Sequence, residues 1–150
     1  MLKVGDKAPA FTLLSDAGET VSLQGFLGKT VILYFYPKDM TPGCTTEACE
    51  FNAALPSLKK SKAVVLGVSF DDEKRHQKFI EKYSLGFDLL VDGDKKTAKD
   101  YGVYQKKKFM GREFMGIVRS TFLIDEKGQL EKIWSPVSVK GHVDEVLASL

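Results

Sequence analysis

The two cysteines of this chain, Cys44 and Cys49, are the residues best suited to covalent chemistry. Two cysteines are too few for a secreted scaffold held together by disulfides. In a reducing compartment, such a close pair indicates catalysis, redox sensing or metal binding before a structural disulfide. This pair is therefore the first candidate for the chemistry of the chain.

Cys44 follows a loop that contains prolines and a glycine, and it stands near the expected start of a helix. The first turn of a helix has unpaired backbone N–H groups and the positive end of the helix dipole, which favour a thiolate over a neutral thiol. A cysteine taken at random is more often a small buried hydrophobic residue. The position directly after Pro42 and Gly43 instead favours a reactive thiol that is populated as thiolate near neutral pH.

Cys49 follows Cys44 by five residues on the same expected helix. In an intact helix this spacing separates the two Cα atoms by roughly 8.5 Å and places them on different faces. A disulfide needs Cα atoms within roughly 7 Å of each other. A C-x-x-C pair, at roughly 5 Å, could close without rearrangement. The spacing therefore predicts one cysteine that reacts first and a second that is reached only after the first turns of the helix unwind.

The apolar residues around the cysteines follow patterns that are typical of strands and helices in turn. The continuous apolar run 31–36 predicts a strand in the middle of a sheet, and 63–70 predicts a second buried strand. Between them, apolar residues at helical spacing predict a helix that begins near residue 44 or 45 and ends before 63. The other expected elements are a hairpin of 10–14 and 20–23, a helix from 71 to about 83, a strand 87–91, a helix 95–101, a hairpin of 120–124 and 129–134, and a final helix from about 142 to 150.

This order of elements predicts an α/β protein with a thioredoxin-like fold, in which helices flank a central mixed β-sheet and an N-terminal β-hairpin is added. In open α/β sheets, sites form beyond the carboxyl ends of the strands, where the loop 37–44 is expected. The stretch 102–116 is rich in Lys and Gly and has no clear hydrophobic period, so it is expected to be a surface loop. No repeat or linker divides the chain, which predicts a single domain over 1–150.

Charge and hydropathy limit the classes of partner. The chain has 22 Lys and Arg against 20 Asp and Glu, interleaved along its length, so a nucleic-acid partner is not expected. The longest basic run, 106–108, is interpreted as a solvated loop. No apolar stretch is long enough to span a membrane, and the N-terminus lacks the apolar core of a signal peptide. These features predict a cytoplasmic protein without a membrane partner.

The segment 34–51 resembles the active-site segment of peroxiredoxins, and it is most similar to that of the bacterioferritin comigratory protein or peroxiredoxin Q subfamily. The family pattern P-x-x-x-T-x-x-C is met by Pro37, Thr41 and Cys44. The second cysteine of the subfamily, five residues on, is met by Cys49. The resemblance therefore rests first on the residues around the cysteine pair.

Two further segments extend the resemblance over essentially the whole chain. The family has an arginine just before a late strand, and Arg119 meets this element in the segment 118–125. The opening segment 4–11 also resembles the corresponding segment of the family.

The resemblance implies an atypical two-cysteine thiol peroxidase that reduces hydrogen peroxide and organic hydroperoxides in antioxidant defence and redox homeostasis. The peroxidatic Cys44 would become a sulfenic acid. The resolving Cys49 would then form a redox disulfide with it, and thioredoxin or a similar dithiol reductant would reduce this bridge. The subfamily resemblance favours a monomer, and no cofactor or metal ion is expected.

The resemblance also assigns roles to residues around Cys44. Arg119 would favour the thiolate and bind the peroxide, whereas alone it would more often be a surface salt-bridge partner. The Thr41 hydroxyl can donate and accept hydrogen bonds, whereas alone it would be a turn residue. The residues that would shape the loop and shield the thiolate are Pro37, Pro42 and Gly43.

Two other functions compete with the peroxidase. One is a thioredoxin-like disulfide exchanger, against which the cysteine spacing argues, and the other is a redox sensor or binding module that does not cycle. A zinc site and a Cys-His hydrolase are disfavoured, because His76 is interpreted as lying on a charged helix face and His142 near the start of the last helix. Glu47 is expected to be a helix-surface acid rather than a catalytic residue. A docking patch at Phe109 and Met110 is a further hypothesis.

Overall fold

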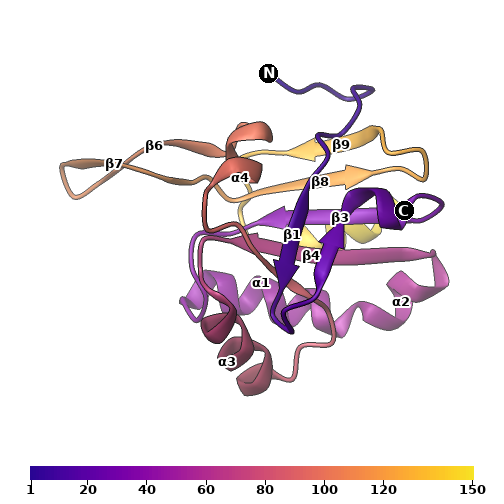
Figure 1. Cartoon of the computed structure of the whole chain (residues 1–150), viewed down its shortest axis with the longest axis horizontal. Coiled ribbons are helices and arrows are strands. Elements are labelled where there is room, and N and C mark those ends of the chain that lie inside the picture. Colours follow the sequence, from indigo (N-terminus) through magenta and orange to yellow (C-terminus); the bar gives the residue numbers. More distant parts are fainter.

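A seven-stranded mixed sheet, in the order β2-β1-β5-β4-β3-β8-β9, forms the centre of the computed structural model, which describes residues 1–150 (Figure 1). A separate two-stranded sheet is formed by β6 and β7. The strands are β1 (Thr12–Ser15), β2 (Thr20–Ser22), β3 (Thr30–Phe35), β4 (Ala63–Ser69), β5 (Leu89–Val91), β6 (Tyr104–Phe109), β7 (Arg112–Ile117), β8 (Ser120–Ile124) and β9 (Leu130–Trp134). The helices are η1 (Leu23–Phe26), α1 (Pro42–Ala53), α2 (Leu55–Lys60), α3 (Glu73–Tyr83), α4 (Lys96–Asp100) and α5 (His142–Leu147).

Strand β3 confirms the prediction of a central strand buried on both faces. It pairs in parallel with β4 on one side and antiparallel with β8 on the other. Because side chains alternate along a strand, successive residues of β3 enter opposite cores. One core takes Val31, Leu33 and Phe35, and the other takes Ile32, Tyr34 and Tyr36, the last just beyond the strand.

The two faces of the sheet are covered by different elements. Helices α1, α2, α3 and α5 contribute buried residues to the core around Tyr34, and the residues they contribute include Phe51, Leu58, Phe79 and Val146. The N-terminal segment, η1 and α4 cover the other face with Phe11, Leu23 and Ala98. In Figure 1, α1, α2 and α3 lie below the sheet. The predicted arrangement of helices on both faces of a mixed sheet is confirmed.

The predicted N-terminal hairpin is confirmed as β1 and β2. Strand β1 pairs antiparallel with β2 and also with β5, through Leu14 opposite Val91 and Ser15 opposite Leu90. The hairpin therefore extends the edge of the central sheet.

The prediction of a surface loop over 102–116 is wrong, because this stretch forms the hairpin β6–β7. Its strands pair from Tyr104 opposite Ile117 to Phe109 opposite Arg112. The two turn residues, Met110 and Gly111, both have positive φ, which is the turn geometry that matches the twist of a two-residue hairpin. Most side chains of both strands are exposed, so no alternation of apolar and polar residues marked them. Figure 1 shows this hairpin extending away from the central sheet.

The helix predicted from residue 44 or 45 to before 63 differs at its start and in its continuity. It begins at Pro42, because a proline at the first helical position lacks only an N–H that would be unpaired anyway. It is interrupted at Ala54, and α2 follows with Pro56 in its first turn. Pro56 has no N–H to donate to the carbonyl four residues earlier, so a continuous helix would lose a bond there.

None of the helices combines the length and the apolar character that a membrane span requires.

Candidate active site

Cys44 is the third residue of α1 and is almost completely buried, with 1% of its surface exposed. Strand β3 ends at Phe35, and the loop after it leads directly into α1. The thiol therefore lies beyond the carboxyl end of a central parallel strand, where sites of α/β sheets are expected. Its position in the first helical turn also brings it close to unpaired backbone N–H groups.

Arg119 joins Cys44 to an acidic residue. Its Nη2 donates to Cys44 Sγ at 3.2 Å, and its Nη1 donates to Glu47 Oε1 at 2.7 Å. Arg119 directly precedes β8, whose first residue, Ser120, lies opposite Phe35 at the end of β3. Antiparallel pairing of β8 with β3 therefore carries the guanidinium to the loop that leads to Cys44.

The charges around Arg119 keep it protonated. Burial alone would lower the pKa of Arg119, but the neighbouring charges of Glu47 and Cys44 raise it above its ordinary value. Only 16% of the arginine side chain is exposed, so little water screens these interactions. A fixed cation within hydrogen-bond distance of the sulfur stabilises a thiolate.

Gly43 provides the space that Arg119 occupies. A Cβ atom at this position would lie 3.2 Å from Nη2 of Arg119. A side chain here would press on the same nitrogen that donates to Cys44. Gly43, which is predicted to shape the loop, is therefore within contact distance of the Arg119 guanidinium.

Glu47 is fully buried, so the expectation of a helix-surface acid is wrong. Burial raises its pKa to about 7, although the charge and hydrogen bond of Arg119 act in the opposite direction. Its second carboxyl oxygen, Oε2, has no hydrogen-bond partner. The spacing could have identified it, because residues three apart on a helix lie on one face, and Cys44 is three residues before Glu47.

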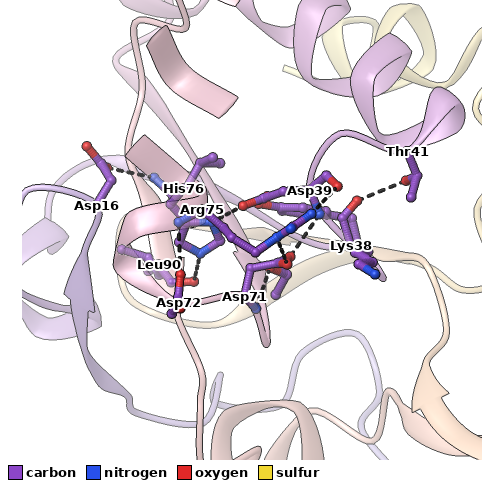
Figure 2. Close-up of polar contacts among 12 residues, drawn as sticks. Asp16, Lys38, Asp39, Thr41, Asp71, Asp72, Arg75, His76 and Leu90 are labelled. Atoms are coloured by element: carbon purple, nitrogen blue, oxygen red, sulfur yellow. Dashed lines mark hydrogen bonds and ion pairs between the residues drawn. The ribbon is translucent and has the colours of Figure 1, made fainter. Parts of the chain in front are cut away.

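Thr41 immediately precedes α1, but its side chain does not cap the helix. Its hydroxyl donates instead to the carbonyl oxygen of Lys38 at 2.9 Å, as Figure 2 shows. This bond closes the loop onto itself next to Cys44. Of the two loop prolines, Pro37 is partly buried after β3, and Pro42 is exposed as the first residue of α1.

Cys49 is not brought to Cys44. Both cysteines are free thiols, with Cys44 buried and Cys49 partly buried. Helix α1 is continuous through both of them, so the separation of roughly 8.5 Å expected for an ideal helix applies. A disulfide between them requires the helix to open.

The two histidines are buried, and neither bonds to Cys44. The interpretation of His76 as lying on a charged helix face is wrong, because it is fully buried and bound to Asp39. His142 lies at the start of α5, as predicted, with its Nε2 2.8 Å from the hydroxyl of Thr121. Burial lowers the pKa of His142 below its ordinary value.

An open cleft of about 510 Å³ lies beside the first turn of α1. It separates α1 from the segment that leads into α5. Its lining consists of Pro42, Gly43, Thr46, Glu50, Val139, Lys140 and Gly141. The cleft borders the helix turn that carries Cys44, but Cys44 itself is not among its lining residues.

Comparison with known proteins decides the family. The model of the AhpC/TSA family matches residues 4–133, a range that includes both cysteines, Glu47 and Arg119. The chain belongs to the AhpC/TSA family of peroxiredoxins. The resemblance seen in the sequence is thereby confirmed, and the protein is an oxidoreductase of the thiol peroxidase class.

Relatives in several bacteria share nearly the full length of this peroxiredoxin. It is 52% identical to peroxiredoxin Bcp of Bacillus subtilis over 149 residues, covering 99% of this chain and 95% of the relative. It is 44% identical to peroxiredoxin Bcp of Escherichia coli K12 over 146 residues, covering 97% and 94%.

Solved structures confirm the thioredoxin-like peroxiredoxin fold. The bacterioferritin comigratory protein of Xanthomonas campestris superposes with a TM-score of 0.89 at 42% identity, covering 93% of this chain and 88% of that one. A mutant of peroxiredoxin Q from Xylella fastidiosa superposes with a TM-score of 0.94 at 36% identity, covering 99% and 94%.

Proposed function

We propose that this peroxiredoxin reduces hydrogen peroxide and organic hydroperoxides with Cys44 as the peroxidatic and Cys49 as the resolving cysteine. The observation that carries the proposal is the position of Arg119, whose guanidinium bonds both Cys44 and Glu47. Such a cation stabilises the thiolate and can also bind a peroxide oxygen. The proposed cycle has three steps.

In the first step, the Cys44 thiolate attacks one peroxide oxygen. An S–O bond forms and the O–O bond breaks, so the sulfur is oxidised to a sulfenic acid and the peroxide is reduced. Hydroxide or alkoxide leaves and takes up a proton to give water or an alcohol. Negative charge develops on the leaving oxygen, and the fixed donors of Arg119 are placed to stabilise it.

Glu47 and Thr41 support this step from two sides. Glu47 holds one nitrogen of the Arg119 guanidinium, which leaves the other directed at the sulfur. A buried arginine held at two points has less freedom than one held at a single point. Thr41, which precedes α1, offers a hydroxyl that can turn from the Lys38 carbonyl to the substrate.

In the second step, the Cys49 thiol attacks the sulfenic sulfur of Cys44, an S–S bond forms and water leaves. The start of α1 must unwind for this, because the intact helix keeps the two sulfurs apart. In the third step, thioredoxin or a similar dithiol reduces the bridge by thiol–disulfide exchange. Both thiols are then free again, as they are in this structure.

Two observations support organic hydroperoxides as substrates beside hydrogen peroxide. The cleft beside the first turn of α1, with a volume of about 510 Å³, has room for an organic substituent. The solved complexes of the Xanthomonas campestris protein concern its alkyl peroxide reduction activity. By similarity, we assign the same substrate class to this chain.

We also propose that the enzyme acts as a monomer in the cytoplasm, in antioxidant defence and redox homeostasis. Cys44, Glu47 and Arg119 come from one chain and form their bonds without a second copy. Two free thiols fit a reducing compartment that supplies a dithiol donor. Sedimentation velocity of the reduced and oxidised protein tests the monomer.

Intact mass and a free-thiol count before and after one equivalent of hydrogen peroxide test the cycle. The expected result is the loss of two hydrogens and both thiols, reversed by thioredoxin. Cys44→Ser should consume no peroxide, whereas Cys49→Ser should react once and accumulate a sulfenic acid that dimedone traps.

Other results would favour the competing functions. Two thiols that persist for minutes would exclude the peroxidatic role of Cys44. A single oxidation that no dithiol reverses would indicate a redox sensor. Reduction of insulin disulfides without a reaction with peroxide would indicate a disulfide exchanger.

A further inference from the structure

The loop between β3 and α1 is anchored by a buried ion pair outside the site described above. His76 Nδ1 on α3 lies 2.6 Å from Asp39 Oδ2 in the loop, and both side chains are 0% exposed (Figure 2). Asp39 stands five residues before Cys44. The family pattern around Cys44 assigned no role to either residue.

The partners of His76 favour a ring that carries two protons. Its Nε2 lies 2.9 Å from the carbonyl oxygen of Leu90, which can only accept a hydrogen bond. Its Nδ1 faces the Asp39 carboxylate, which also accepts. Burial alone would lower the pKa of His76, but the hydrogen bond and charge of Asp39 raise it above its ordinary value. These contacts favour a protonated His76 ring beside the Asp39 carboxyl group.

Asp39 is held from three further directions. The hydroxyl of Tyr36, just after β3, donates to Asp39 Oδ1 at 2.5 Å. The backbone N–H of Asp39 donates to Asp71 Oδ2 at 2.8 Å, and Arg75 Nη2 donates to the Asp39 carbonyl oxygen at 3.4 Å. Arg75 also bonds Asp71, as Figure 2 shows. The loop is thereby tied to β3, to the β4–α3 connection and to α3.

The residues that follow Asp39 have fewer polar ties to other elements, although Met40 packs against the core around Tyr34. Met40 has a positive φ, and Thr41 does not cap α1 with its side chain. The Thr41 hydroxyl bonds only within the loop, to Lys38. The firm attachment of the loop therefore ends at Asp39, directly before the segment that must unwind.

We propose that Asp39 and His76 are a positioning pair, which sets the balance between the folded arrangement of Cys44 that reacts with peroxide and the unwound arrangement that reaches Cys49. The proposal rests on the proposed roles of the two cysteines. With the pair intact, the loop delivers Cys44 to Arg119. With the pair broken, the loop and the first turn of α1 move more freely.

If the pair has this role, breaking it should change the rate of Cys44 oxidation and the rate of disulfide formation in opposite directions. In Asp39→Asn and His76→Gln, oxidation of Cys44 by peroxide should slow by about 10- to 100-fold, because the thiolate is displaced from Arg119. Formation of the Cys44–Cys49 disulfide should become severalfold faster, because the unwound arrangement is more populated. General destabilisation of the protein gives no reason for this opposition.

Each rate can be measured by itself. Stopped-flow oxidation followed by dimedone trapping, in a Cys49→Ser background, measures the first step without any disulfide. Quenched-flow alkylation with mass spectrometry, in chains that keep both cysteines, measures disulfide formation. In the double variant Asp39→Asn/His76→Gln, both rates should match those of the single variants, because residues that act as a pair are not additive.

Two further variants distinguish the proposed role from misfolding and from a general loss of stability. Tyr36→Phe removes one hydrogen bond to Asp39 and keeps the ion pair, so it should shift both rates in the same directions by a smaller factor. Asp92→Asn is the matched control, because Asp92 is a fully buried carboxylate that bonds the backbone of α4 away from Cys44. It should lower thermal stability and leave both rates unchanged.

The outcomes separate this proposal from the proposed function. If the wild-type chain forms no Cys44–Cys49 disulfide, the proposed cycle fails. If it forms one, but the folded variants change neither rate or slow both, the positioning role of Asp39 and His76 is overturned.

Discussion

Nη1 of Arg119 and Oε1 of Glu47 lie 2.7 Å apart in the interior of the protein, and this bond connects the start of β8 to α1. The glutamate is fully buried and has one free carboxyl oxygen, and the arginine uses its other terminal nitrogen on Cys44. The bond is therefore both a structural link and part of the environment of the thiol. Substitution of Arg119 and substitution of Glu47 should therefore have different effects on activity and stability.

Replacement of Arg119 should affect the reaction with peroxide more than the fold. We expect Arg119→Met to slow Cys44 oxidation by about 10²-fold or more, because a charged donor to the sulfur and the leaving oxygen is lost. Arg119→Lys should be intermediate, because a lysine cannot hold two partners with a planar fork. Stopped-flow peroxide kinetics measure the effect, and a rate within twofold of wild type in Arg119→Met would contradict it.

Glu47 should make the stability of the protein fall as pH rises from about 4.5 to about 7. Its pKa is raised from 4.5 to about 7 in the folded chain, so in this window the folded state binds more protons than the unfolded state. The stabilisation is complete below pH 4.5 and is lost as pH rises through about 7, with a total on the order of 3 kcal/mol.

Urea unfolding across this range, compared with Glu47→Gln, measures the effect of Glu47. The variant keeps the shape of the side chain but cannot titrate, so its pH dependence should be shallower. Equal slopes in the two proteins would show that folding does not raise the pKa of Glu47.

His76 should add a second loss of stability at higher pH. Its pKa is raised above 6.5 in the folded chain, so its contribution is complete below pH 6.5 and is lost as pH rises through the folded value. The charged groups that act on it are Asp39 and Asp71, and these in turn are bound by Tyr36 and Arg75.

The unfolding free energy of His76→Gln should therefore decline less than that of wild type above pH 6.5. The same variant should keep the decline caused by Glu47 between 4.5 and 7. Histidine chemical shifts in an NMR titration assign the change to His76, and an ordinary histidine titration there would contradict the buried pair.

Gly43→Ala should move stability and activity in opposite directions. Alanine in place of glycine within a helix is worth up to about 1 kcal/mol of stability. The added Cβ would lie 3.2 Å from Arg119 Nη2, so the guanidinium should shift away from Cys44 and the peroxide reaction should slow.

Gly93→Ala is a comparison for the effect on the rate, because Gly93 lies in the turn between β5 and α4 and nothing lies within 4 Å of a Cβ at that position. Thermal melts and peroxide kinetics on both variants test the expectation. A Gly43→Ala variant that reacts at the wild-type rate would show that the Arg119 guanidinium can shift without slowing the peroxide reaction.

The buried strands and the helix after Cys44 could be predicted because their patterns are local. The run 31–36 is apolar throughout, and it forms a central strand with both faces buried. The hairpin 104–117 could not be predicted in this way, because most of its side chains face solvent on both sides. Hydrophobic period identifies an element only where one of its faces is covered.

The site itself could be predicted from the sequence only through the resemblance to the family. Arg119 bonds Cys44 from 75 residues away, and no local rule brings them together. His76 lies on a helix with many charged residues, and only the fold places it against Asp39, 37 residues before it. Glu47 was expected on the helix surface, although its spacing of three from Cys44 places both residues on one helix face and could have indicated its buried position beside the thiol.

The hairpin β6–β7 is a ribbon of only two strands, so each of its strands keeps one edge of backbone groups without a strand partner. Such edges can recruit strands of other molecules and lead to aggregation. Lysines at 106–108 and Arg112 give this ribbon a repeated positive charge, and lysine on an exposed edge opposes strand addition. The basic run therefore gives the protruding hairpin a means of staying soluble while Phe109 and Met110 are exposed at its tip.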